Sequence, residues 1–140
     1  MRCRDWFRAV GVVVLVGSGG SILAQNPPSN PALTRTTLAQ GDLSVPGRET
    51  VVMRVGFPPG ATAGWHTHPG EEISYVTQGQ IMLMIAGQPP RKVSAGEALI
   101  VPAGAVHNAR NDGTSPAELL VVYVVEKGKP LRTPAPEPAH

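Results

Sequence analysis

The chain of 140 residues contains one cysteine, and aromatic residues make up only 4% of it. Because Cys3 lies near the N-terminus, the rest of the chain can form no disulfide and would have to hold a metal ion through nitrogen and oxygen ligands alone. No apolar run is long enough to span a bilayer. The length and these absences predict a single domain without disulfides.

The N-terminus has the pattern of an export signal. Three arginines precede an apolar core over residues 9–16, and Ile22-Leu23-Ala24 offers a cleavage site before Gln25. We expect cleavage of residues 1–24 and a periplasmic or secreted protein, because the core is too short for a membrane anchor. The segment holds three of the 12 Lys and Arg and one of the 10 Asp and Glu, which leaves nine of each. The mature chain thus has no net charge that points to nucleic acid or membrane.

Both ends of the remaining chain are rich in proline and polar residues. Residues 25–33 and residues 127–140 have few side chains to bury, which predicts two flexible segments. His140 stands at the tip of the second segment, where we expect a solvated side chain. The body of the protein, residues 34–126, therefore holds the other three histidines.

Residues 34–126 show no sustained helical periodicity. Short β-branched and apolar runs alternate with turn residues, which predicts an all-β fold of antiparallel strands. Asn111-Asp112-Gly113 is the clearest turn signal, and we expect Asn111 to serve that turn. The expected strands cover residues 34–40, 49–57, 62–68, 72–78, 80–86, 91–93, 97–101, 106–110 and 117–126.

Two motifs hold the three histidines together with one glutamate. The first follows the spacing G-x5-H-x-H-x3-E-x6-G, at Gly60, His66, His68, Glu72 and Gly79. The second follows the spacing G-x5-P-x-G-x2-H-x3-N, at Gly96, Pro102, Gly104, His107 and Asn111. Three imidazoles and a carboxylate form a ligand set suited to a divalent transition metal.

These motifs resemble the two sequence motifs of the cupin superfamily at every fixed position. With ordinary residue usage, ten such positions agree by chance at about 10⁻¹³ per placement. The resemblance covers about residues 45–126 and implies a double-stranded β-helix, the cupin jelly-roll barrel, in a small single-domain member. It further implies a metal site like that of germin-like and quercetinase-like proteins, with one divalent ion per chain. Its ligands would be His66, His68, Glu72 and His107.

Strand geometry agrees with this ligand set. Side chains two positions apart face the same way, so His66 and His68 can share one ion, and parity selects Glu72 over Glu71. His107 comes from a strand far along the sequence. An octahedral ion would keep two open positions, which favours Mn, Fe or Ni, with Cu or Zn as alternatives.

Apolar side chains near the ligands are candidates for a substrate pocket. They are Trp65, Met53, Phe57, Met82 and Met84, and for Trp65 packing in the core or rim is the alternative role. Further candidates for the cavity wall are Val51, Val55, Leu99 and Val101. Such a lining would favour an apolar or aromatic ligand over a polyanion. Tyr75 is out of register with Glu72 and is not assigned to the site.

Three functions fit these features, and a fold alone does not choose among them. The first is a metal-dependent oxygenase-type enzyme (a dioxygenase or oxidoreductase) on a small phenolic or diketone substrate, with Glu72 as ligand and proton acceptor. The second is an O₂-independent isomerase, lyase or decarboxylase on a small keto compound or sugar, which would want a Lys, Arg or second acid near the ion. The third is a non-catalytic periplasmic module that binds or senses a small molecule.

We also expect a homodimer. A small jelly roll has sheet edges that need protection, and cupins commonly pair with an N-terminal strand, here residues 34–40, on the partner. Arg54 has the opposite parity to Met53 and Val55, which turns it toward the outside and a partner subunit. A stable monomer in sedimentation would contradict this expectation.

Overall fold

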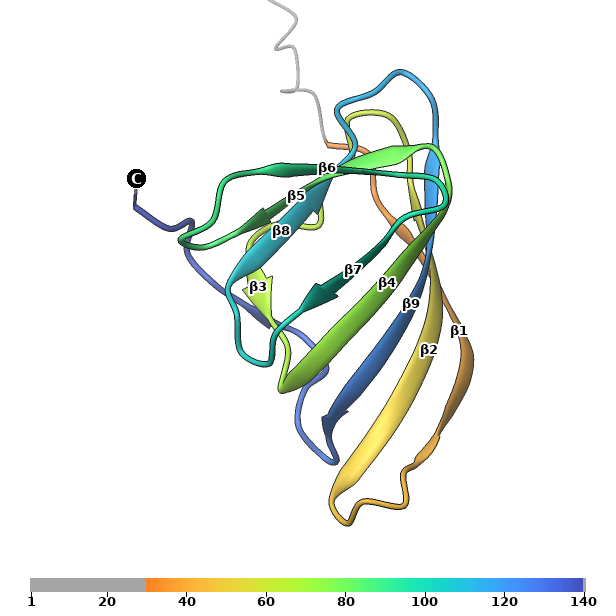
Figure 1. Cartoon of the computed structure of the whole chain (residues 1–140), viewed down its shortest axis with the longest axis vertical. Helices are drawn as coiled ribbons and strands as arrows, with labels where there is room; N and C mark the ends of the chain where they lie inside the picture. Colours follow the sequence, from red (N-terminus) through yellow and green to blue (C-terminus); the bar gives the residue numbers. More distant parts are fainter. Residues whose placement is uncertain (1–29, 140) are drawn as a thin grey trace, which may run out of the picture.

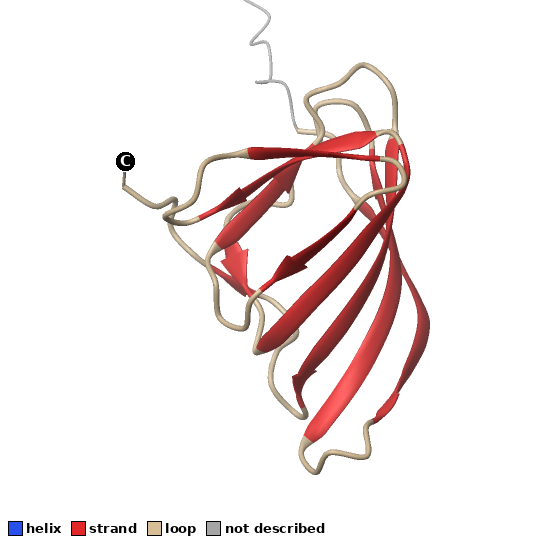
Figure 2. Ribbon diagram, viewed as in Figure 1, coloured by secondary structure: helices blue, strands red, loops and turns tan. Residues whose placement is uncertain are grey.

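The computed structural model describes residues 30–139. The predicted signal peptide, residues 25–29 and His140 lie outside the described residues. Every regular element between residues 30 and 139 is a β-strand, as Figure 2 shows. In this part of the chain there is accordingly no helix with the length and apolar character needed to cross a membrane. The predicted all-β class is confirmed.

The strands form two antiparallel five-stranded sheets that face each other (Figure 1). The first sheet, in spatial order, contains β1 (Thr34–Asp42), β2 (Arg48–Phe57), β9 (Ala117–Glu126), β4 (Gly70–Gln78) and β7 (Ala98–Val101). The second contains β10 (Thr133–Pro134), β3 (His66–Thr67), β8 (His107–Arg110), β5 (Gln80–Ile85) and β6 (Arg91–Ser94). The chain passes repeatedly from one sheet to the other, which is the predicted double-stranded β-helix.

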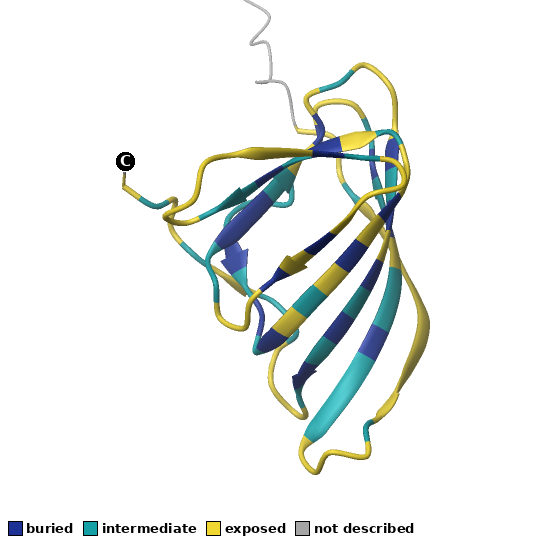
Figure 3. Cartoon of the chain, in the orientation of Figure 1, coloured by how far each residue is buried: buried dark blue, intermediate teal, exposed yellow. Residues whose placement is uncertain are grey.

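Strict alternation of side chains builds the core between the sheets. On β9, at the centre of the first sheet, every second residue is buried: Ala117, Leu119, Val121, Tyr123 and Val125. The same alternation runs along β4, where Figure 3 shows buried and exposed residues in turn. Each fully buried Val or Leu contributes about 1.5–3 kcal/mol of hydrophobic stabilisation, so this stripe holds the two sheets together.

The outer face of the first sheet carries exposed apolar side chains. Ile73 on β4 lies opposite Ile100 on β7, and the two are 40% and 64% exposed. Arg54 on β2 shares this face and forms an ion pair with Glu118 at 3.7 Å, so it points outward as expected. Both charged groups are largely exposed, and the pair contributes little to stability.

Asn111 has the turn role that the sequence predicts. Its side-chain oxygen accepts a hydrogen bond from the Gly113 amide at 2.9 Å, which closes the turn after β8. Its amide nitrogen donates to the carbonyls of Phe57 and Ser115 at 2.9 and 2.8 Å. The side chain is only 1% exposed, and each of its polar atoms has a partner, so it anchors the loop to β2.

The expected strand over residues 62–68 is mostly irregular. Only His66–Thr67 forms β3, and Thr62 makes an isolated bridge to Arg110. Gly64 lies between them with a φ of 76°, a conformation that extended strands do not use. The glycine therefore divides the segment, although the Ala63 amide still bonds to the Ala109 carbonyl at 2.8 Å.

Part of the segment predicted to be a flexible tail, residues 127–140, pairs with the second sheet. β10 pairs with the free edge of β3, Thr133 opposite Thr67, and the Ala135 amide donates to the Trp65 carbonyl at 3.0 Å. Leu131 packs against the core. Backbone bonding to an unpaired strand edge orders this segment, although its proline-rich composition suggested otherwise.

Candidate metal centre

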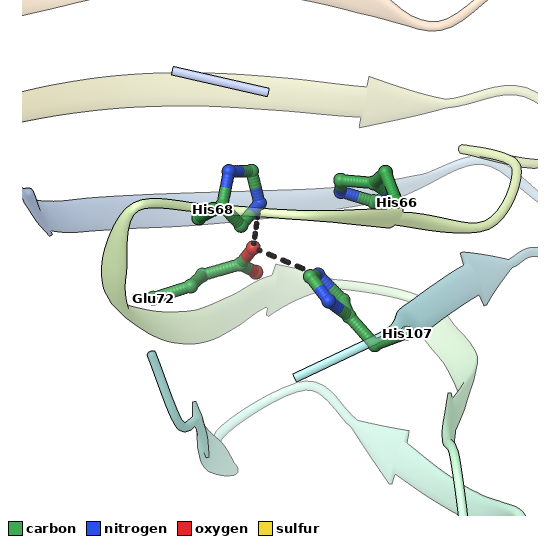
Figure 4. A group of neighbouring side chains, drawn as sticks. All are labelled: His66, His68, Glu72 and His107. Carbon is green, nitrogen blue, oxygen red and sulfur yellow. Dashed lines mark ion pairs between the residues drawn. The ribbon is translucent and has the colours of Figure 1, made fainter. Parts of the chain in front are cut away.

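The four residues predicted as metal ligands converge in the interior of the fold (Figure 4). His66 lies on β3, His68 directly follows it, Glu72 lies on β4 and His107 on β8. Each side chain offers one ligand atom, and these four atoms all lie within 4.8 Å of one another. The three imidazoles are at most 5% exposed, so their rings are almost fully removed from bulk water. These four residues could hold a metal ion.

Backbone carbonyls fix which nitrogen of each imidazole faces the centre. The Nδ1 atoms of His66 and His107 each lie beside the carbonyl two residues upstream, at 2.7 and 3.0 Å. The Nδ1 atom of His68 lies 2.5 Å from the carbonyl of Leu131. Since a carbonyl can only accept, Nδ1 carries a hydrogen in each ring, which in a neutral imidazole leaves the lone pair on Nε2. This is the tautomer in which an imidazole binds a metal through Nε2.

Glu72 supplies the negative charge of the centre. One of its oxygens lies 3.0 Å from Nε2 of His68 and 3.4 Å from Nε2 of His107, while Ser74 donates to the other oxygen at 2.7 Å. Burial alone would raise the pKa of Glu72, but the contacts with His107, His68 and Ser74 outweigh it and hold the pKa far below its ordinary value. The side chain is therefore a carboxylate.

The arrangement suits a cation. The Nε2 atoms of His68 and His107 are buried and have no hydrogen-bond partner among the described residues, although both face the carboxylate. Lone pairs of imidazole and carboxylate repel at such distances unless a proton or a metal ion stands between them. The buried, convergent lone pairs therefore fit a divalent ion with nitrogen and oxygen ligands.

His66 is neutral in the metal-free protein. Burial lowers its pKa from 6.5 to about 4, and the neighbouring charges of His107, Arg132 and His68 act in the same direction, against the hydrogen bond to Gly64. At neutral pH a metal ion therefore meets little competition from protons at this nitrogen.

We expect the metal-free protein to lose stability as the pH falls from about 6.5 to 4. The unfolded chain takes up a proton on His66 near pH 6.5, while the folded chain resists until about pH 4, so acid favours unfolding by up to about 3 kcal/mol. Glu72, whose folded pKa is lowered, acts in the same direction below its ordinary pKa. Urea unfolding at several pH values measures the free energy of unfolding as a function of pH. In His66→Gln this free energy should change less with pH above pH 4.5. An unchanged profile in that variant would contradict the assignment.

A cavity of about 130 Å³ opens beside the four ligands. Met53 and Phe57 line it as predicted, together with Val55 and Leu99 from the candidate wall. It is smaller than the pockets of about 300–1,000 Å³ that hold drug-sized ligands, so it suits a molecule of few atoms.

Five other predicted pocket or wall residues do not line this cavity: Trp65, Met82, Met84, Val51 and Val101. On β5 the inward positions belong to Ile81 and Leu83, so alternation turns Met82 and Met84 to the opposite face. Trp65 likewise alternates with the inward-facing His66. Val51 and Val101 are buried in the core away from the cavity.

Several residues that line the cavity were not predicted from the sequence, among them Arg35, Tyr123, Leu131 and Arg132. Tyr123 packs its ring against that of His68, with centroids 4.7 Å apart. Burial raises the pKa of its phenol, and the charge of Glu72 adds to the effect, so the hydroxyl keeps its proton. Its place in the alternation of residues 117–126 was a usable signal.

The antiparallel double-stranded β-helix defines a jelly-roll protein. Three imidazoles and one carboxylate converge inside it and form a site that could hold a metal. Residues 53–123 match the family described as Cupin domain. The chain belongs to the cupin family.

Relatives and solved structures agree with this membership. The chain is 32% identical over 107 residues to oxalate oxidase 2 of Hordeum vulgare, covering 69% of this chain and 46% of that protein. The crystal structure of the DMSP lyase DddQ from Ruegeria pomeroyi matches with a TM-score of 0.55 and 26% identity, over 61% of this chain and 42% of that one. A cupin-like protein from Thermotoga maritima matches with a TM-score of 0.55 and 28% identity, over 69% of each chain. The chain spans about half the length of the curated relatives it matches.

Proposed function

We propose that the protein is a metal-dependent enzyme of the oxidase or oxygenase type that acts on a small organic molecule. The observation that carries this proposal is the closed His₃Glu cluster, whose Nε2 lone pairs face a small, mostly apolar cavity. Similarity to oxalate oxidases over two thirds of the chain supports it.

A redox-capable ion, when bound, would supply activation of O₂ and polarisation of a substrate oxygen. The chain's own residues hold the metal ligands in position and exclude water from the site. The carbonyl contacts lock the three imidazoles, and the apolar wall around Met53, Val55 and Phe57 limits access of water to the reacting groups. The low pKa of Glu72 makes it a weak base, which favours the role of ligand over that of proton acceptor.

A second candidate is an O₂-independent lyase. This class would want a positioned Lys, Arg or second acid near the ion, and two arginines, Arg35 and Arg132, line the cavity. Similarity to a dimethylsulfoniopropionate lyase, 34% over 56 residues, supports this alternative.

Metal content and oxygen uptake distinguish these functions. We expect the purified full-length chain to hold close to one ion per molecule by elemental analysis, and His107→Ala to hold almost none. Protein loaded separately with Mn, Fe, Ni, Cu and Zn would be screened with small acids, phenols and diketones in an oxygen electrode. Oxygen consumption that zinc does not support is the expected result.

Three other outcomes would contradict the proposal. Turnover without oxygen uptake would establish the lyase class instead. Ligand binding without turnover would favour a binding module, and a folded wild type that takes up no ion would remove the metal site altogether.

A further inference from the structure

Two arginines from distant parts of the chain meet at the cavity. Arg35 lies on β1 opposite the inward-facing Val55, and Arg132 lies just before β10. Both line the cavity that contains the four candidate metal ligands. The site therefore combines a metal-binding cluster with two permanent cations, which an apolar pocket for a neutral ligand would not need.

Arg132 is held in place but not satisfied. One terminal nitrogen donates to the carbonyl of Ala63 at 2.6 Å, which anchors the guanidinium on the loop before β3. Its Nε atom is buried and has no hydrogen-bond partner among the described residues. A buried donor without an acceptor costs about 1–3 kcal/mol, so an acceptor brought by a ligand would be stabilised there.

The charges of the two arginines are also unbalanced. Within residues 30–139 neither guanidinium forms an ion pair with a carboxylate. Burial lowers the pKa of Arg132, and the nearby charge of Arg35 acts in the same direction. Glu72 shares the cavity, but its carboxylate already faces His68 and His107. An anion is the missing partner.

We propose that Arg35 and Arg132 bind the carboxylate of a small anionic substrate whose other end reaches the metal centre. Guanidinium groups match a carboxylate through paired N–H donors, and the cavity of about 130 Å³ admits only a short molecule. The apolar wall accommodates a short carbon chain between the two ends. Tyr123 lines the same cavity and adds a phenol hydroxyl. The assignment of the far end rests on the proposed function, whereas binding of the carboxylate does not require turnover.

The test measures binding of propionate and of its neutral analogue propionamide by NMR titration of the full-length protein, with and without metal. We expect Arg35→Gln and Arg132→Gln each to weaken propionate binding at least tenfold, with propionamide unaffected. Arg132→Lys should restore part of the affinity, because it keeps the charge. Arg54→Gln is the matched control, since Arg54 lies on β2 but faces outward.

The metal content and the unfolding midpoint of each variant are measured as well, so that the proposal of carboxylate binding and the proposal of metal-dependent turnover can be judged separately. Arginine-dependent propionate binding in a protein without turnover would support this inference while the proposed function fails. Equal binding of propionate and propionamide, or equal losses in the Arg54 and Arg35 variants, would overturn it. If Arg132→Gln fails to fold, the exposed Arg35 variant still decides the question.

Discussion

Replacing Glu72 by glutamine is expected to lower the affinity for a divalent transition ion by about 100-fold or more. Loss of a group that only orients a metal ligand lowers metal affinity by about 10–100-fold. The change at Glu72 instead removes the charge of a ligand itself. The fold should persist, because glutamine has the same shape and Ser74 can still donate to its side-chain oxygen.

The stability of the loaded protein provides the measurement. An ion at about 1,000 times its dissociation constant stabilises the folded state by about 4.1 kcal/mol, and a 100-fold weaker site keeps only about 1.4 kcal/mol of this. Glu71→Gln is the matched control, because Glu71 precedes Glu72 but is exposed on the outer face of β4. Equal metal-induced stabilisation of both variants would rule out Glu72 as a ligand.

The resemblance of the two motifs to those of cupins was enough to predict which four residues converge. His66 and His68 share a face because side chains alternate, and Glu72 follows after a turn. The distant His107 needed the second motif, and the structure pairs it directly with His66 between β3 and β8. These features depend on local geometry and on a match of ten fixed positions, and both can be read from the sequence.

The wall of the cavity was harder to predict, for a physical reason. Alternation tells which residues share a face, but it selects the inward face only when the other face is polar. On β5 both sets are apolar: Ile81 and Leu83 on one side, Met82 and Met84 on the other. The two faces of this strand therefore do not differ in polarity in the sequence. For this reason Met82 and Met84 were expected to line the pocket, whereas they lie on the face opposite to Ile81 and Leu83.

The two arginines were missed because their positions depend on long-range pairing. Arg35 reaches the cavity through the register of β1 on β2, with Arg35 opposite Val55. Arg132 reaches it because the next residue, Thr133, pairs with Thr67 at the edge of β3. Its guanidinium then donates to the carbonyl of Ala63, 69 positions away along the chain. Proline-rich composition reports the low hydrophobicity of such a segment and not the free strand edge that receives it.

Adding one methyl group at Gly70 is expected to destabilise the protein by about 3 kcal/mol or more, at or above the upper end of ordinary overpacking. A Cβ atom there would lie 2.0 Å from the carbonyl oxygen of Val124 and 2.6 Å from the Cα atom of Val125. Both contacts are with the backbone of β9, so no side-chain rotation relieves them and β4 must move. Glu72 lies two residues further along β4, so the same displacement should weaken metal binding.

Urea unfolding of Gly70→Ala beside Gly41→Ala isolates this effect. Gly41 also lies in a strand, β1, but a Cβ there meets nothing within 4 Å, so its replacement should change stability by no more than about 0.5 kcal/mol. A Gly70 variant with the midpoint and metal content of the Gly41 variant would show that β4 can move away from β9 at little cost. The expected result is that the Gly70 variant loses both stability and bound metal. This would show that the close approach of β4 to β9 sets the position of the Glu72 carboxylate, so backbone packing outside the ligands determines the geometry of the centre.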